Sequence, residues 1–403
     1  MPIASSRAAR VRGAFVSWSY ALVACAPLLA AAPARAQQPA GAKGAPARAE
    51  TVQAIASPRV PLPAEAASAG VTRFSFIVYG DTRGRQDGVL PQYEHSLVVS
   101  SMLRTIAALA TGPDPVRFVL QSGDAVVNGR EARQWNVSFV ELVNRLTTEG
   151  GVPYFLAPGN HDVTSSMDTA APGRKAGLRN YMDAVSALIP PAGTGRRLAG
   201  YPTFAFGYGN TFVLAFDSEI AGDSTQLAWA EAQLAGLDRG RYAHVVALFH
   251  NPAFSSGPHG GANVEPQTAL VRARWMPLFR KYHVELLFTG HEHFFEHWVE
   301  RYHDAAGHPA RIDQIVTGGG GAPLYRYEGE PDLRAYVAAA GPDSLRLEHL
   351  VRPGDTAGQN PYHYVVVHVN GAHVSLQVVG VDWGRDFQPY RSARTSLQDD
   401  PGR

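Results

Sequence analysis

Three features of the 403-residue sequence predict an α/β fold. Short apolar runs of the kind that form buried strands recur along the chain, and stretches of helical length lie between many of them. Apolar residues make up 45% of the chain, which is enough to bury a large core. Because one strand–helix alternation runs throughout, we assign residues 71–383 to a single domain.

Residues 1–36 have the features of a secretory signal peptide. Three arginines precede an apolar run that starts at Gly13, and Ala-Arg-Ala at positions 34–36 fits the cleavage pattern. We therefore expect export to the periplasm or out of the cell. Two alternatives stay open: a lipid anchor on Cys25, which follows a lipobox-like Leu-Val-Ala, and an uncleaved membrane helix. No later apolar run approaches the ~18 residues of a membrane span, so we expect none after cleavage.

The remaining segments follow from composition and periodicity. Residues 37–70 are rich in Ala, Pro, Gln and Gly and predict a flexible linker. Strands are expected at residues 74–80, 116–121, 154–157, 211–216, 244–249, 284–288 and 312–316. Helices are expected near 95–110, 131–148, 224–237 and 266–282, and a hairpin over 362–381. Polar residues 384–403 predict a loose tail.

Five of the predicted strands run into residues of the metal-binding type. These residues are Asp81, Asp124, the Asn160-His161-Asp162 run, His250, and His291 with His293. In open α/β sheets, functional groups gather beyond the carboxyl ends of the strands. Carboxylates, imidazoles and an amide oxygen together suit Zn, Mn or Fe. Each motif alone is also typical of a turn or a structural residue, but five in this order predict a metal site.

The ordered motifs resemble those of the calcineurin-like metallophosphoesterases over about residues 73–325. The matching stretches are Gly123-Asp124, Gly159-Asn160-His161-Asp162, His250 and Gly290-His291-Glu292-His293. The loop after His250, which contains His259, and the glycine-rich stretch 317–325 are similar to the purple-acid-phosphatase branch. The resemblance implies two packed, mixed β-sheets flanked by helices, an αββα architecture.

The resemblance also implies two adjacent divalent ions, with Asp124 bridging them. Asn160, His250 and His291 would complete one metal site, and Asp81 and His293 would belong to the other. His161 would face the leaving oxygen of the substrate as general acid, and Asp162 would orient it. Two such ions can supply hydroxide near neutral pH and stabilise charge on a phosphate.

Two positions depart from the family pattern. Arg83 replaces the usual metal-binding His of the first motif, and Val127 stands where the purple branch has a Tyr. A guanidinium has no lone pair to offer a metal. Three hypotheses follow. The first metal is weakly bound while Arg83 contacts the substrate phosphate, or the site holds one tight metal and Arg83 replaces the other electrostatically. In the third, Arg83 forms a structural ion pair with Asp81 or Asp87.

These observations predict an exported phosphoesterase that acts on small phosphate esters, monoesters above all, through metal-bound hydroxide. The alternatives are a nucleotidase or phosphodiesterase at the same site, and a non-catalytic metal-binding protein with a degenerate first site. Removing residues 1–36 removes four of the 36 basic residues and leaves 32 against 35 acidic ones. That balance does not predict binding to a nucleic-acid polymer. Loop 255–260 and segment 163–200 are candidate substrate contacts.

Overall fold

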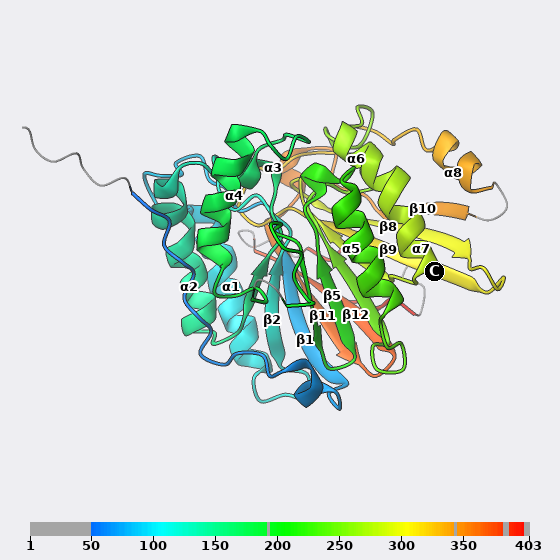
Figure 1. Ribbon diagram of the computed structural model, residues 1–403, viewed down its shortest axis with the longest axis horizontal. Coiled ribbons are helices and arrows are strands. Elements are labelled where there is room, and N and C mark those ends of the chain that lie inside the picture. Colours follow the sequence, from blue (N-terminus) through cyan, green and yellow to red (C-terminus); the bar gives the residue numbers. More distant parts are fainter. Residues whose placement is uncertain (1–49, 192–193, 342–344, 382–386, 399–403) are drawn as a thin grey trace, which may run out of the picture. The chain divides into compact units, whose positions relative to one another are not determined.

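The computed structural model describes residues 50–191, 194–341, 345–381 and 387–398, and the predicted signal peptide lies outside this part. The chain from Glu50 onward forms one compact unit. It contains two β-sheets with helices on both sides (Figure 1). The predicted αββα architecture is confirmed.

The first sheet has six strands in the order β13-β12-β11-β1-β2-β3. Their bounds are β1 Arg73–Tyr79, β2 Val116–Gln121, β3 Tyr154–Leu156, β11 His363–Asn370, β12 His373–Gly380 and β13 Thr395–Ser396. Strands β1, β2 and β3 are parallel, whereas β11 pairs antiparallel with both β1 and β12. The predicted hairpin is therefore β11–β12. Strand β11 pairs directly with β1, so the hairpin is an internal part of the first sheet.

The second sheet has seven strands in the order β10-β8-β9-β7-β6-β5-β4. Their bounds are β4 Phe204–Tyr208, β5 Thr211–Ala215, β6 His244–Leu248, β7 Leu286–Thr289, β8 Phe295–His303, β9 Pro309–Thr317 and β10 Leu345–Val351. The neighbours β5, β6, β7 and β9 are parallel, and the outer pairs are antiparallel. The parallel strands of both sheets supply the residues of the candidate site.

Helices occupy the outer layers (Figure 1). Their bounds are α1 Tyr93–Leu109, α2 Glu141–Thr148, α3 Asn160–Val163, α4 Pro172–Val185, α5 Ser224–Ala235, α6 Pro266–Leu270, α7 Met276–Lys281 and α8 Arg334–Ala340. The π-helical turns η2 Gln134–Val140 and η4 Val271–Trp275 lead into α2 and α7. Short 3-10 turns are η1 Glu65–Ser68, η3 Ser218–Ile220 and η5 Ala357–Gln359.

Aromatic side chains hold the two sheets together. Phe76 of β1 meets Phe288 of β7 edge-on, with ring centroids 6.2 Å apart. Phe118 of β2 meets Phe206 of β4 in the same way at 5.4 Å. Such edge-to-face pairs add ~0.5–1.5 kcal/mol each beyond the area they bury. These aromatic contacts fix the position of one sheet relative to the other. As a result, the residues at the strand ends of both sheets come together.

Two predictions about the ends of the domain do not hold for the described residues; residues 37–49, 384–386 and 399–403 lie outside the described part. In the expected linker, Ile55 is 1% exposed, its N–H donates to the carbonyl of Ala184, and residues 65–68 form η1. In the expected loose tail, β13 pairs with β12, and Tyr390 and Leu397 are buried. The apolar side chains that these low-complexity segments do contain bind to the core and order the described residues around them.

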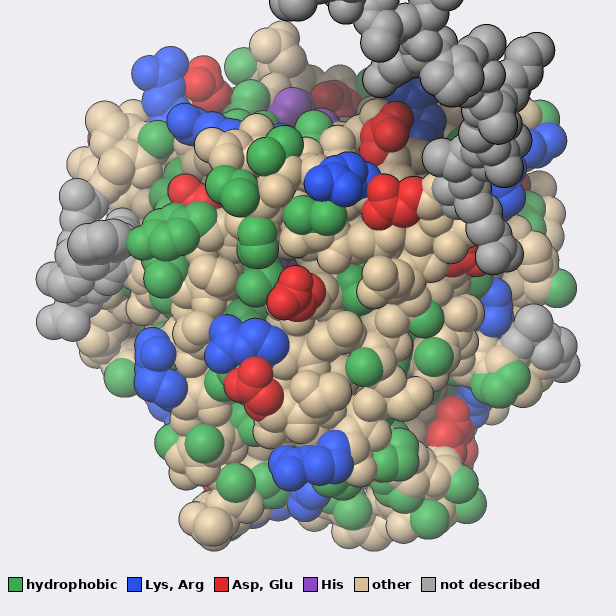
Figure 2. All heavy atoms as spheres, turned by 90° about the vertical axis from the view of Figure 1, so that its left-hand side faces the viewer, with side chains coloured by type: hydrophobic (Ala, Val, Ile, Leu, Met, Phe, Trp, Pro, Cys, Tyr) green, Lys and Arg blue, Asp and Glu red, His purple; other side chains and the backbone are tan. Residues whose placement is uncertain are grey.

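The surface over α2 and α4 shows no gathering of one charge. On the face turned to the viewer in Figure 2, basic and acidic side chains are interspersed. Glu149 and Arg145 of this region form an ion pair four residues apart, with Arg145 Nε 3.0 Å from Glu149 Oε1. The visible described residues therefore present a surface of mixed charge.

Candidate metal centre

The strand ends place the predicted site residues together. Asp81 follows β1, Asp124 follows β2, Asn160 and His161 follow β3, His250 follows β6, and His291 and His293 follow β7. Asp81, Asp124, His250, His291 and His293 are all buried. Because parallel strands of each sheet end at one edge, residues far apart in sequence converge there.

The backbone at this edge is unusual. Asp81, Asp124 and His291 have φ values of 59°, 56° and 71°, in the left-handed region that is rare for residues other than glycine. Strained backbone of this kind gathers at functional sites. Gly159 allows the close approach, since a Cβ there would lie 2.3 Å from Oδ1 of Asp124.

One group of donor atoms surrounds an oxygen of Asp124, and we call it the asparagine group: Asp124 Oδ1, Asn160 Oδ1, His250 Nε2 and His291 Nδ1. His250 Nε2 lies 2.9 Å from Asn160 Oδ1, 3.4 Å from Asp124 Oδ1 and 3.1 Å from His291 Nδ1. The four atoms come from four different strand ends and face one another.

Protons in the asparagine group point away from its centre. His250 Nδ1 donates to the carbonyl of Ser122 at 3.0 Å, and His291 Nε2 donates to Glu265 Oε2 at 2.8 Å. Burial lowers the pKa of His250 to about 3 and also lowers the pKa of His291, so both rings are neutral. Each ring therefore turns a lone pair toward two oxygens. This donor set fits a divalent cation.

The other group, which we call the arginine group, consists of Asp81, Asp124 Oδ2 and His293, with Arg83 among them. The ligand atoms of the two carboxylates and His293 lie within 4.8 Å of one another. His293 Nδ1 donates to the carbonyl of Pro323 at 2.7 Å, so its Nε2 carries a lone pair. That atom faces Arg83 Nη2 at 3.3 Å, and Arg83 Nε donates to Asp124 Oδ2 at 3.2 Å.

Arg83 therefore pairs with Asp124, not with Asp81 or Asp87 as the ion-pair hypothesis proposed. Its side chain is 17% exposed and lines the pocket described below. Asp87 instead accepts the N–H groups of Gly84 and Val127, at 2.9 and 3.0 Å. Asp87 thus shapes the loop that presents Arg83, and the charge of Arg83 is directed at the centre of the site.

His161 lies at the mouth of the site. Its ring is 30% exposed, Nδ1 donates to the carbonyl of Val127 at 2.6 Å, and Nε2 lies 3.9 Å from Asp124 Oδ2. The ring is therefore oriented by a backbone carbonyl. Asp162 was expected to orient His161, but its carboxylate bonds backbone amides instead of the ring.

Asp162 holds the loops together. Its carboxylate accepts the backbone N–H groups of Asp124, Ala125 and Gly159, each at 2.9 Å. A buried carboxylate that is bonded to three amides joins the end of β2 to the start of α3. Its effect on the site is to position the backbone of Asp124, whose Oδ1 accepts the N–H of His161 at 2.9 Å.

A pocket of about 370 Å³ opens over both donor groups. It is lined by Arg83, Asp124, Asn160, His161, Ser165, Met167, Glu219, His259, Glu265, Pro266, Gln267, His291 and Tyr325. Ser165 and Met167 come from the segment 163–200, and His259 from the loop 255–260, which were candidate substrate contacts.

Sequence reasoning missed Glu265. This residue is the N-cap of α6, and its two oxygens bond to His259 Nδ1 at 2.9 Å and His291 Nε2 at 2.8 Å. Burial would raise the pKa of Glu265, but the hydrogen bonds that His259 and His291 donate to it hold that pKa below its usual range, so Glu265 is ionised. Glu265 thus fixes which nitrogen of His291 carries a proton. Its position 26 residues before His291 belongs to no recognisable motif.

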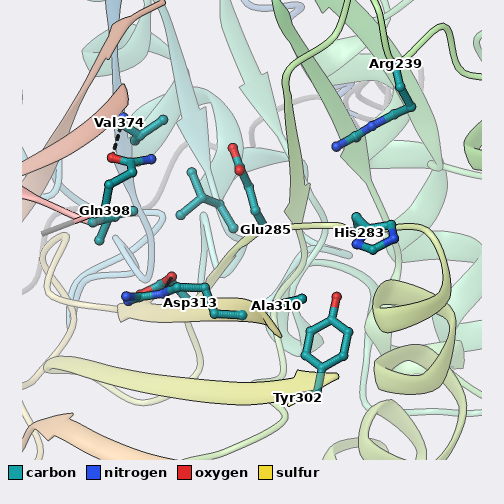
Figure 3. A pocket seen from close by; sticks show the side chains of 11 residues that line it. Arg239, His283, Glu285, Tyr302, Ala310, Asp313, Val374 and Gln398 are labelled. Carbon is teal, nitrogen blue, oxygen red and sulfur yellow. Dashed lines mark hydrogen bonds and ion pairs between the residues drawn. The ribbon is translucent and has the colours of Figure 1, made fainter. Parts of the chain in front are cut away.

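A second pocket, of about 290 Å³, lies near the amino end of β7 (Figure 3). Arg239, His283 and Tyr302 line it together with Glu285 and Asp313. Both acids are already paired: Glu285 lies 2.5 Å from His244 Nδ1, and Asp313 lies 2.8 Å from His297 Nε2. The second pocket therefore offers no unpaired carboxylate among these two acids. The asparagine group, whose donor atoms face one another, borders the first pocket.

Comparison with known proteins identifies the family. A model described as "Calcineurin-like phosphoesterase" matches residues 75–295, which is more than half of the chain. The chain belongs to this family. The description of the family names the hydrolysis of phosphate esters, and the structure offers candidate ligand groups for metal ions. No curated protein sequence matches the chain.

One solved structure supports the fold. A purple acid phosphatase from yellow lupin (Lupinus luteus) seeds is similar with a TM-score of 0.55 and 17% identity, over 81% of this chain and 54% of that one. The chain thus spans about half the length of that enzyme. A dimetal phosphatase from Danio rerio has a TM-score of 0.43 and 12% identity, over 80% of this chain and 98% of that one. Among the described helices, none has the length and apolar character needed to cross a bilayer.

Proposed function

We propose that the protein is an exported metal-dependent phosphatase that prefers phosphomonoesters and uses Zn, Mn or Fe. The observation that carries the proposal is the asparagine group. Its two neutral imidazoles and two oxygens face one another with no proton between them, next to the partly exposed ring of His161. Metal-assisted hydrolysis of an ester uses this combination of a bound cation and a nearby proton donor.

Each residue has a defined part in this proposal. A divalent ion held by Asp124, Asn160, His250 and His291 would act as a Lewis acid and lower the pKa of water. Arg83 offers guanidinium N–H groups to the phosphate oxygens. His161 already donates Nδ1–H to Val127, so a second proton on Nε2 makes an imidazolium that can donate to the leaving oxygen. His259 and Tyr325 line the same pocket.

The pocket supports a small substrate with a terminal phosphate. Its volume of about 370 Å³ lies in the lower part of the range for small-molecule sites, ~300–1,000 Å³. Arg83, His161 and His259 on its walls can donate to several phosphate oxygens at once. A monoester presents three non-bridging oxygens to such donors and a diester only two, so this lining favours monoesters.

Hydrolysis of two synthetic esters tests the proposal. We expect chelator-treated protein to be inactive toward p-nitrophenyl phosphate and to recover when Mn, Zn or Fe is added. Turnover of bis-p-nitrophenyl phosphate should be much slower under the same conditions. Faster turnover of the diester would replace the proposal with a phosphodiesterase, and full activity in the presence of chelator would refute metal dependence.

Export is supported by the pattern of residues 1–36. We expect the mature protein, recovered from the periplasm or medium, to begin at Gln37. Cys25→Ser should leave export and processing unchanged. Attachment of labelled fatty acid to the wild-type chain, lost in Cys25→Ser, would show a lipid anchor instead.

A further inference from the structure

The arginine group has the ligand atoms of a metal site, but a side-chain cation already lies among them. Arg83 Nε is 3.2 Å from Asp124 Oδ2, and Arg83 Nη2 is 3.3 Å from His293 Nε2. Asp81 Oδ1 lies 3.5 Å from the same nitrogen of His293. Two of the three donors that would bind an ion are therefore hydrogen-bonded to a guanidinium.

A divalent ion and this guanidinium compete for the same atoms. Imidazole nitrogens and carboxylate oxygens bind zinc at ~2.0–2.2 Å, so an ion among these three donors would lie close to the Arg83 nitrogens. Like charges at such separations repel strongly where water is scarce. Asp81 and His293 are buried, with at most 1% of either exposed. The arginine group as it stands does not fit a metal ion.

The position of Arg83 is built into the site. Tyr325 stacks on His293, with ring centroids 3.9 Å apart and an interplanar angle of 13°. The ring thus covers His293, and it lines the same pocket as Arg83. By contrast, among the described residues no Arg or Lys side chain is hydrogen-bonded to the four donor atoms of the asparagine group.

We infer that the protein binds one divalent ion per chain, in the asparagine group, and that Arg83 permanently takes the place of the second ion. The charges agree with this assignment. One divalent ion and one guanidinium against the two carboxylates of Asp81 and Asp124 leave a net charge of +1, which attracts a phosphate. The inference rests on the proposed function and specifies how many ions that function uses.

Metal stoichiometry tests the inference without reference to activity. Apoprotein is dialysed against buffered Mn²⁺ or Zn²⁺. The number of metal ions bound per chain is then measured by elemental mass spectrometry. We expect one ion per wild-type chain and two per Arg83→His chain, because His restores a ligand and removes the cation. Arg83→Lys keeps the charge and should still bind one ion.

The Mn²⁺ electron paramagnetic resonance spectrum gives a second readout. Wild type and Arg83→Lys should show isolated ions, whereas Arg83→His should show an exchange-coupled pair. Two ions of similar affinity in the wild type would overturn the inference, and so would a single ion in a folded Arg83→His chain. If Arg83→His does not fold, the wild-type stoichiometry decides alone. A wild type that hydrolyses esters with two ions refutes only this inference, whereas one that binds no metal and hydrolyses nothing refutes the proposed function as well.

Discussion

The asparagine group and the arginine group share Asp124 but differ in the protons and charges that face their centres. In the asparagine group, Ser122 and Glu265 take the ring protons of His250 and His291, and lone pairs point inward. In the arginine group, N–H groups of Arg83 point at Asp124 and His293. Both groups contain residue types that bind metals. The difference teaches that hydrogen bonds around a donor set decide what it can hold.

The two buried carboxylates show the same contrast. Burial would raise the pKa of Asp124, but the guanidinium of Arg83 and the backbone N–H that His161 donates to Oδ1 hold it below its usual range. Burial raises the pKa of Asp81, and the neighbouring charge of Asp124 raises it further, against a smaller opposing effect of Arg83. Arg83 is hydrogen-bonded to Asp124 and only a weaker influence on Asp81. Asp124 is therefore the carboxylate common to both donor groups.

Removing one imidazole from each group should have very different effects. We expect His250→Ala to lose nearly all bound metal and to lower kcat/KM by at least ~10³-fold. The reason is that His250 Nε2 lies next to the other three donor atoms of the asparagine group, Asp124 Oδ1, Asn160 Oδ1 and His291 Nδ1. His293→Ala, the matched control from the arginine group, should retain one ion per chain. Elemental analysis and phosphate release measure both. Equal loss of metal in the two variants would erase the distinction between the groups.

His161 belongs to neither group, so its loss should separate chemistry from metal binding. We expect His161→Ala to lower kcat by ~10²–10⁴-fold, the range for a general acid, with metal content unchanged. The defect should grow as the leaving group becomes more basic, because such an oxygen needs the proton more. Rates for a series of substituted phenyl phosphates measure this dependence. An equal defect for all leaving groups would contradict proton donation by His161.

Much of the site could be predicted because its residues follow strands directly. A short buried run fixes where a strand ends. Parallel strands bring Asp81 and Asp124 to one edge of the first sheet, and they bring His250 and His291 to one edge of the second, whatever their separation in sequence. The fold was predictable to a similar extent for the parallel strands. The antiparallel strand β8 was missed, since Glu296, His297 and Glu300 interrupt its apolar pattern. These residues are buried, and Arg280 pairs with Glu300 at 2.8 Å.

The contacts of the site were less predictable than its residues. The role of Asp162 depends on backbone amides from two loops, and that of Glu265 on a helix start that lies beside His291 only in the folded chain. The partner of Arg83 was expected nearby in sequence, at Asp81 or Asp87, but it is Asp124. A side chain as long as arginine reaches over several ångströms, so sequence distance says little about its partner.

Glu265 offers a finer test of the asparagine group. Groups that fix the far nitrogen of a metal-binding His typically contribute ~10–100-fold to metal affinity. We expect Glu265→Ala to weaken metal binding by that factor, whereas Glu265→Gln, which keeps an oxygen acceptor for His291 Nε2, should lose less. Competition with a chelating dye measures the dissociation constants. Unchanged affinity in Glu265→Ala would mean that His291 needs no such partner.

The smallest predicted effect concerns a buried hydrogen-bond network that reaches the residue after Asp124. His95 is fully buried, lies 3.0 Å from the hydroxyl of Tyr79, and contacts Gln92 Oε1 at 2.9 Å. Gln92 in turn donates to the carbonyl of Ala125 at 2.8 Å, next to Asp124. Burial lowers the pKa of His95 from 6.5 to about 3, so the folded protein keeps this ring neutral.

The sign of the pH effect follows from this difference. Between pH 6.5 and about 3 the unfolded chain protonates His95 and the folded protein does not, so acid reduces the free energy of unfolding. One such group contributes a slope of up to ~1.4 kcal/mol per pH unit. We expect the slope for His95→Gln, measured by urea denaturation of the apoprotein between pH 4 and 6, to be shallower by up to that amount. Parallel stability curves for the two proteins would show that His95 takes up its proton equally in the folded and unfolded chains. The buried surroundings of His95 would then tolerate a charged imidazole.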